Sequence, residues 1–334
     1  MSLLPVLAFL AALELIDAYK LLKFRRVLQT VAAGWVAALA CLALNSVVFA
    51  AGVPSESWAR FGAPVLEETA KALCVVLLIR AGRIAFMVDA AISGFAVGAG
   101  FAVVENIVYL AGSAAPDATT AAVRGLGTAL MHSGTAAIFG LAAVNRIEFS
   151  KSLQYTAFIP GFAVAIAIHM LYNQFLLPPV ASAAALLVVL PSVLSFGFWR
   201  GEKRMGKWLG AKLDRDMELL GMISTGVFDK SPAGAYLRSL ESAFGPLVLG
   251  DMLCYLQVSV ELSAQAKGAL LRREMGFPEA PDPELPARLK ELKYLERQIG
   301  RAGKYALAPL LGSSHRDEWE IHQLTDGAGP GQTA

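Results

Sequence analysis

Residues 86–111, FMVDAAISGFAVGAGFAVVENIVYLA, contain only two charged side chains, Asp89 and Glu105, in 26 positions. A helix needs about 20 mostly apolar residues to cross the hydrocarbon core of a bilayer, and this stretch is long enough. Its glycines, among them Gly94, Gly98 and Gly100, suit the close helix packing found in membranes. The stretch therefore predicts a spanning helix inside a helix bundle.

Similar apolar stretches recur through the first 199 residues. The chain of 334 residues is 56% hydrophobic and 17% charged, whereas soluble domains carry about 25% charge. We therefore predict an all-α, polytopic membrane helix bundle over residues 1–199. Its seven candidate spans are 3–22, 29–51, 62–80, 86–111, 123–144, 155–177 and 179–199.

Charged residues become frequent from residue 200 onward. In 247–272 and 284–300 apolar residues recur at helical spacing, which is typical of amphipathic helices. We expect a mostly helical soluble region over 200–326 and a disordered tail over 327–334. The net charge of +2 is too small to indicate a nucleic-acid partner. Three scattered cysteines without a CxxC motif exclude a thiolate metal site.

The basic residues predict an orientation for the bundle. Connections after the first, third, fifth and seventh spans hold twelve Lys and Arg residues, whereas the opposite connections hold only Arg60 and Arg124. Cytoplasmic loops of membrane proteins carry the excess of basic residues. We therefore expect an N-terminus outside, a cytoplasmic C-terminus and a site in the cell membrane.

Polar residues interrupt four of the predicted spans. Carboxylates at membrane depth are costly and mark functional sites by default. At about 1.5 Å rise per residue, all of these groups fall about 9–12 Å below the outer surface, although their helices run in alternating directions. We expect them to line one hydrated cavity that opens to the outer face. They are Glu67 and Glu68, Glu105, His132, and His169 with Asn173.

Two chemistries fit this set. His132 and His169 with Glu105 and Glu68 form a ligand set suited to zinc, which prefers tetrahedral nitrogen and oxygen ligands; a spare glutamate would then be the general base. In a metal-free version one glutamate activates water directly, and His169 with Asn173 stabilises the oxyanion. Lys71 can pair with either member of the glutamate pair. We expect it nearer Glu67, with Glu68 nearer the chemistry.

The ordered motifs resemble a known family. Glu67-Glu68-x-x-Lys71, Phe101-x-x-x-Glu105-Asn106, His132 and His169-x-x-x-Asn173, each on its own span, resemble the PrsW-type intramembrane proteases, relatives of the CAAX prenyl endopeptidase and bacteriocin-immunity superfamily. The resemblance covers roughly residues 60–177. It implies a bacterial inner-membrane protease that cuts a membrane-anchored partner, in the best-known members an anti-sigma factor, near the extracytoplasmic face. It also implies that Glu67, Glu68, Glu105, His132 and His169 form the active site, with Asn173 in support.

Two other functions remain open at this point. Intramembrane carboxylates and histidines also form proton relays in transporters, although the expected site is shallow and no repeat with paired broken helices is evident. The bundle could also be a non-catalytic scaffold whose tail signals. We expect an intramembrane endopeptidase with zinc as cofactor, and a single-span membrane protein as its partner.

Overall fold

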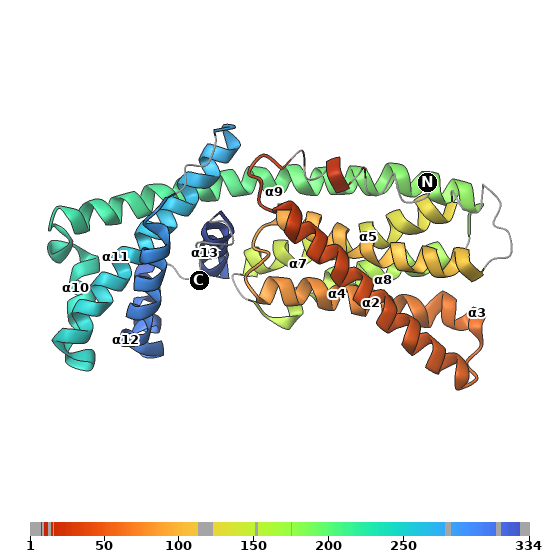
Figure 1. Ribbon diagram of the computed structural model, residues 1–334, viewed down its shortest axis with the longest axis horizontal. Coiled ribbons are helices and arrows are strands. Elements are labelled where there is room, and N and C mark those ends of the chain that lie inside the picture. Colours follow the sequence, from red (N-terminus) through yellow and green to blue (C-terminus); the bar gives the residue numbers. More distant parts are fainter. Residues whose placement is uncertain are drawn as a thin grey trace. The chain divides into compact units, whose positions relative to one another are not determined.

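The computed structural model describes residues 8, 10–12, 15, 17–112, 123–150, 153–174, 176–277, 282–311 and 315–327. The chain divides into two compact units, residues 1–204 (unit 1) and 205–334 (unit 2). Both are built from helices (Figure 1), and no strand occurs in the described ranges. The predicted all-α class is confirmed.

Unit 1 contains the long apolar helices. Two short π-helical segments, η1 and η2, precede α4 and α7, and a 3₁₀ turn, η3, precedes α8. In chain order the elements are α2 (Phe24–Ala50), α3 (Ser55–Ser57), η1 (Trp58–Gly62), α4 (Ala63–Arg80), α5 (Met87–Gly112), η2 (Val123–Thr128), α7 (Ala129–Ser150), η3 (Tyr155–Ala157), α8 (Ile159–Asn173) and α9 (Pro179–Ser224), which continues beyond the unit.

Within the described residues, six helices are long and apolar enough to cross a membrane. Five coincide with predicted spans: α2, α5, α7, α8 with η3, and the apolar part of α9. Helix α4 lies at the predicted position but carries four charged residues in 18, so its composition alone would not mark it as a span. The predicted first span, 3–22, is only partly described, since nine of its twenty positions lie outside the described residues. The tail after Gly327 lies wholly outside them.

Helices α5 and α7 form the centre of unit 1, and most of their side chains are buried. Close contact between them depends on glycine. A Cβ atom added at Gly98 of α5 would lie 2.2 Å from the carbonyl oxygen of His132 in α7. Such close backbone approach is the packing mode of small residues in membrane helices. Gly98 therefore sets the distance between α5 and the helix turn that carries His132.

The helix entries of unit 1 are fixed by local polar contacts. The Asp89 carboxylate accepts hydrogen bonds from the backbone N–H groups of Ala85 (3.0 Å) and Phe86 (2.8 Å). It thereby satisfies donors that the start of α5 would otherwise leave without acceptors. At the same end of the bundle, Arg204 donates to Asn145 of α7 at 2.6 Å.

Unit 2 has its own apolar core, which includes Met252, Leu256 and Leu292. Helices α11 and α12 change direction at Gly245 and Gly300, whose φ angles are +77° and +64°, a region that favours glycine. Although α11 is also apolar enough to span a membrane, its apolar residues fill this core. The elements are η4 (Phe228–Lys230), α10 (Pro232–Ser239), α11 (Glu241–Glu274), α12 (Leu285–Leu311) and α13 (His315–Gly327).

Candidate active site

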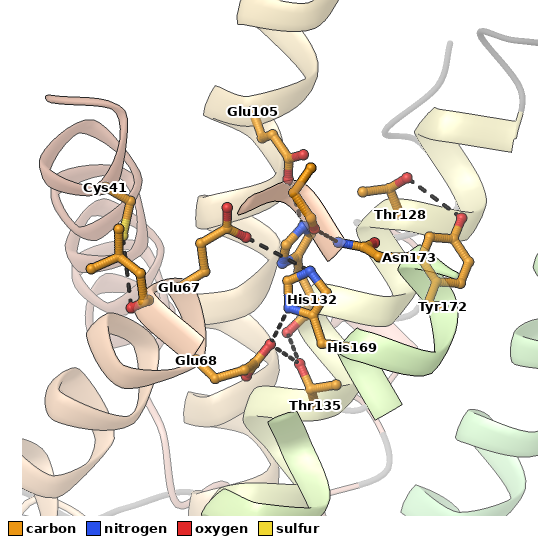
Figure 2. Close-up of polar contacts among 12 residues, drawn as sticks. Cys41, Glu67, Glu68, Glu105, Thr128, His132, Thr135, His169, Tyr172 and Asn173 are labelled. Atoms are coloured by element: carbon orange, nitrogen blue, oxygen red, sulfur yellow. Dashed lines mark hydrogen bonds and ion pairs between the residues drawn. The ribbon is translucent and has the colours of Figure 1, made fainter. Parts of the chain in front are cut away.

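Four helices bring the polar residues of the predicted set to one cavity of unit 1, as expected. Its volume is about 670 Å³, within the range of about 300–1,000 Å³ typical of ligand pockets. Figure 2 shows the glutamates and the two imidazole rings gathered between the helices. The predicted residues that line it are Glu67 (α4), Glu105 (α5), His132 (α7), and His169 and Asn173 (α8).

The positions of these residues in their helices explain the convergence. Glu67 lies near the beginning of α4 and His132 near the beginning of α7, whereas Glu105 and His169 lie near the ends of α5 and α8. Helices α4 and α7 begin at the end of the bundle where α5 and α8 finish. Alternating chain direction therefore places all four at one end of the bundle.

His169 is held between two glutamates. Its Nδ1 donates to Glu68 Oε1 at 2.8 Å, and its Nε2 lies 3.8 Å from Glu67 Oε2. In a neutral imidazole that donates from Nδ1, Nε2 has the lone pair, and here Nε2 faces Glu67. A histidine oriented by a carboxylate in this way is the usual arrangement of a metal-binding imidazole.

Glu68 is the acceptor of a buried network. Its Oε1 also accepts a hydrogen bond from Lys71 Nζ at 2.6 Å and from Thr135 Oγ1 at 3.1 Å. Glu68 and Lys71 are 2% and 0% exposed, so their charges depend on each other for stabilisation. Lys71 Nζ also lies 3.1 Å from His132 Nδ1. The network links α4, α7 and α8.

The prediction that Lys71 lies nearer Glu67 is wrong, because the ion pair forms with Glu68. Adjacent residues of a helix point about 100° apart. Lys71, three and four residues on, is within reach of both glutamates, but Glu68 and Lys71 both contact Thr135 of α7. Glu67 faces the cavity and is the glutamate beside His169 Nε2.

His132 also contacts a carboxylate. Its Nε2 lies 2.5 Å from Glu105 Oε2, but this nitrogen makes no hydrogen bond of acceptable geometry within the described part of the chain. The ring centroids of His132 and His169 are 4.9 Å apart, and the two ring planes are nearly perpendicular. Two buried nitrogen ligands and nearby carboxylates thus share a space of a few ångströms.

The donor set fits a metal ion. Ligand atoms of Glu67, His132 and His169 all lie within 4.8 Å of one another. The buried His132 Nε2, which lacks a hydrogen bond, and the preoriented His169 Nε2 both suit a cation that prefers imidazole nitrogen and carboxylate oxygen. Glu67 occupies the position in this group that we had expected Glu68 to take.

Two further features emerge only from the structure. Thr135 joins the network, and its spacing of three from His132 places both on one helix face, which could have indicated it. Asn173 lines the cavity, but its Nδ2 donates to the backbone carbonyl of Ala59 in η1 at 2.9 Å. It therefore ties α8 to a π-helical segment, a feature found frequently at functional sites.

Acidic and histidine side chains that converge inside a bundle of apolar helices fit the class of intramembrane hydrolases. Comparison with family models identifies this class more closely: the model of the PrsW family of intramembrane metalloproteases matches residues 23–196. The chain belongs to this family and is a multi-pass membrane protease. Searches of curated proteins and of solved structures found no match.

Proposed function

We propose that this protein is a zinc-dependent intramembrane endopeptidase that cleaves a single-span membrane protein near the extracytoplasmic face. The proposal rests on one observation above all, the grouping of Glu67, His132 and His169 within 4.8 Å. These three residues would hold the zinc ion, and Glu105 would lie beside it. A zinc ion in this position supplies Lewis-acid activation of water and of the scissile carbonyl.

The chain's own residues then have separate tasks. Glu105 is the general base in this proposal, because its side chain is 28% exposed, lines the cavity and contacts His132. It takes a proton from the attacking water and returns it to the amine that leaves. Glu68 acts through His169, which it orients, and is a positioning residue.

Lys71 connects the Glu68–Lys71 ion pair to His132, since its Nζ lies 3.1 Å from His132 Nδ1. In this proposal it positions the ring whose Nε2 completes the three-ligand group.

The cavity indicates how a substrate would enter. Its rim includes Trp58 and the exposed ion pair between Arg60 and Glu56, 2.8 Å apart. A cavity of about 670 Å³ can hold a short extended segment of a substrate. An intact helix, which is about 10 Å wide with its side chains, is too large for it. We therefore propose that a substrate span unwinds locally at its outer end before cleavage. An anti-sigma factor with one span is the first substrate to test.

The excess of Lys and Arg in alternate connections supports an orientation with the N-terminus outside and the C-terminus in the cytoplasm. In this orientation the cavity opens toward the extracytoplasmic side of a bacterial inner membrane.

The test measures zinc content and cleavage in the same samples. Detergent-purified wild type should contain about one zinc ion per chain and cut a single-span reporter substrate. Glu67→Ala and His169→Ala should lose both properties and still elute as folded protein. Thr69→Ala is the matched control, because Thr69 lies on the exposed face of α4. Cleavage that persists in metal-free, chelator-treated wild type would overturn the zinc mechanism.

A further inference from the structure

A second cavity lies wholly within unit 2. Its volume is about 440 Å³, the size of a pocket for a small organic ligand. Residues of α9, α11, α12 and α13 line it. Its apolar wall includes Leu219, Tyr255, Val260, Leu292, Leu311 and Leu324.

The same cavity is lined by four basic side chains, Lys212, Arg215, Arg301 and Lys304. Arg301 and Lys304 follow the kink at Gly300. Because φ at Gly300 is +64°, an L-residue there would be strained. The glycine therefore directs the last part of α12, with its two basic residues, toward the cavity.

The acidic residues of the cavity have basic partners already. Asp216 and Glu320 share the buried Lys267, whose Nζ lies 2.8 and 3.0 Å from their carboxylates. Glu296 pairs with Lys304 at 2.6 Å. Four basic side chains line the cavity beside these three acidic ones. Lys267 adds a fifth positive charge next to Asp216 and Glu320, so the lining together with Lys267 has an excess of two positive charges.

Two basic side chains and one hydroxyl point to a ligand. Lys212 and Arg215 donate to the carbonyl oxygens of Leu311 and Leu310 only at 3.3 and 3.5 Å, long for such bonds. Ser259 lines the cavity, and its buried Oγ makes no hydrogen bond in the described part of the chain. A buried hydroxyl without a partner costs free energy that a polar ligand atom can recover.

We propose that this cavity binds a small anionic amphiphile, with its acyl or other apolar body against the leucine wall and its carboxylate or phosphate head among the basic side chains. The apolar wall supplies area for burial. The charge excess selects an anion over a neutral or cationic analogue. A fatty acid and an alkyl phosphate share this chemistry. The proposal concerns unit 2 alone and does not depend on the protease mechanism of unit 1.

The experiment uses the full chain in nanodiscs and a palmitate analogue that carries a diazirine on its chain. After irradiation, mass spectrometry should find the label on peptides of α9, α11 and α12 that line the cavity. Excess palmitate and hexadecyl phosphate should each compete, and hexadecanol should not. Competition by only one of the two anions identifies the head group, and either result supports the proposal. Equal competition by hexadecanol would overturn it.

Two variants with matched controls separate binding from partition into lipid. Ser259→Phe fills the cavity and should reduce labelling at least tenfold, whereas Cys254→Phe, on the exposed face of the same helix, should not. Arg301→Gln and Lys212→Gln together change the charge of the cavity without filling it and should reduce labelling by the anionic probe. Lys290→Gln is their control, since Lys290 is exposed and does not line the cavity. Unchanged labelling in Arg301→Gln/Lys212→Gln would contradict the proposal even if Ser259→Phe fails to fold.

Discussion

The Oε1 atom of Glu68 accepts hydrogen bonds from both His169 Nδ1, at 2.8 Å, and Lys71 Nζ, at 2.6 Å. One carboxylate oxygen therefore orients a candidate metal ligand and neutralises a fully buried lysine. Glu67, its neighbour in the sequence, faces the cavity and approaches His169 from the other ring nitrogen. The adjacent glutamates thus have different roles in the proposed site, and their substitutions should fail in different ways.

Glu67→Gln should abolish cleavage and zinc binding with a smaller loss of stability than Glu68→Gln, because the proposed ligand is lost but the Glu68–Lys71 ion pair stays intact. Glu68→Gln should lower zinc affinity about 10- to 100-fold, the usual effect of removing a carboxylate that orients a ligand. It should also destabilise the fold by about 3–5 kcal/mol, since Lys71 is left as an unpaired buried charge. Zinc titration and denaturant unfolding of both variants measure these effects. Equal loss of stability in both would contradict the assignment.

Lys71→Met should also destabilise unit 1, because Glu68 loses its cationic partner. When Lys71→Met and Glu68→Gln are combined, no charge is left without its partner. The double variant should therefore be less destabilised than the sum of the single variants, by a coupling of about 1–3 kcal/mol. A double-mutant cycle of unfolding free energies tests this, and additive effects would show that the pair is not coupled.

Gly98→Ala should reduce both stability and cleavage. The new Cβ would lie 2.2 Å from the carbonyl oxygen of His132, so α5 and α7 must separate, at a cost of about 1–3 kcal/mol. Gly112→Ala, in the same helix with no atom within 4 Å of the added Cβ, is the control. In thermal unfolding and cleavage assays, Gly112→Ala should have the stability and the activity of the wild type. A wild-type-like Gly98→Ala would mean that the helices can separate without displacing His132.

Lys267→Met should destabilise unit 2 by about 3–5 kcal/mol, since it leaves the buried carboxylates of Asp216 and Glu320 without their shared cation. Lys290→Met changes an exposed lysine of α12 and should be neutral within about 0.5 kcal/mol. Hydrogen exchange of the full chain, read separately for peptides of the two units, measures the difference. Loss of protection in unit 1 alone would contradict this expectation.

Asp282 should give unit 2 a pH dependence. The backbone N–H of Glu284 donates to its carboxylate at 2.8 Å and, with smaller contributions from Gln265 and Arg288, lowers the pKa of Asp282. A carboxyl whose pKa is lower in the folded than in the unfolded chain stabilises the fold at pH values above its unfolded pKa of about 4. This stabilisation is lost as the pH falls through the pKa of the folded state. The stability difference between wild type and Asp282→Asn should therefore shrink between pH 6 and pH 3. A stability difference that stays constant over this pH range would refute the effect.

Much of unit 1 could be predicted because its signals are local. Five predicted spans match apolar helices of the structure, since about 20 apolar residues in a row leave few alternatives to a spanning helix. The convergence of Glu67, Glu105, His132 and His169 also followed from counting residues along helices of alternating direction. The prediction of helix ends was less accurate: α9 continues to Ser224, because the Lys, Arg and Glu residues that end the apolar stretch are themselves good helix formers.

Residue order alone determined that this chain is a membrane helix bundle with acidic and histidine side chains at one depth. Only the tertiary structure decided that Lys71 pairs with Glu68 and leaves Glu67 beside His169. The spacings of three and four residues are equally compatible with an ion pair. The choice depends on which helix face packs against α7, where Thr135 and His132 complete the network. The roles of the Glu67–Glu68 pair are therefore a property of helix packing.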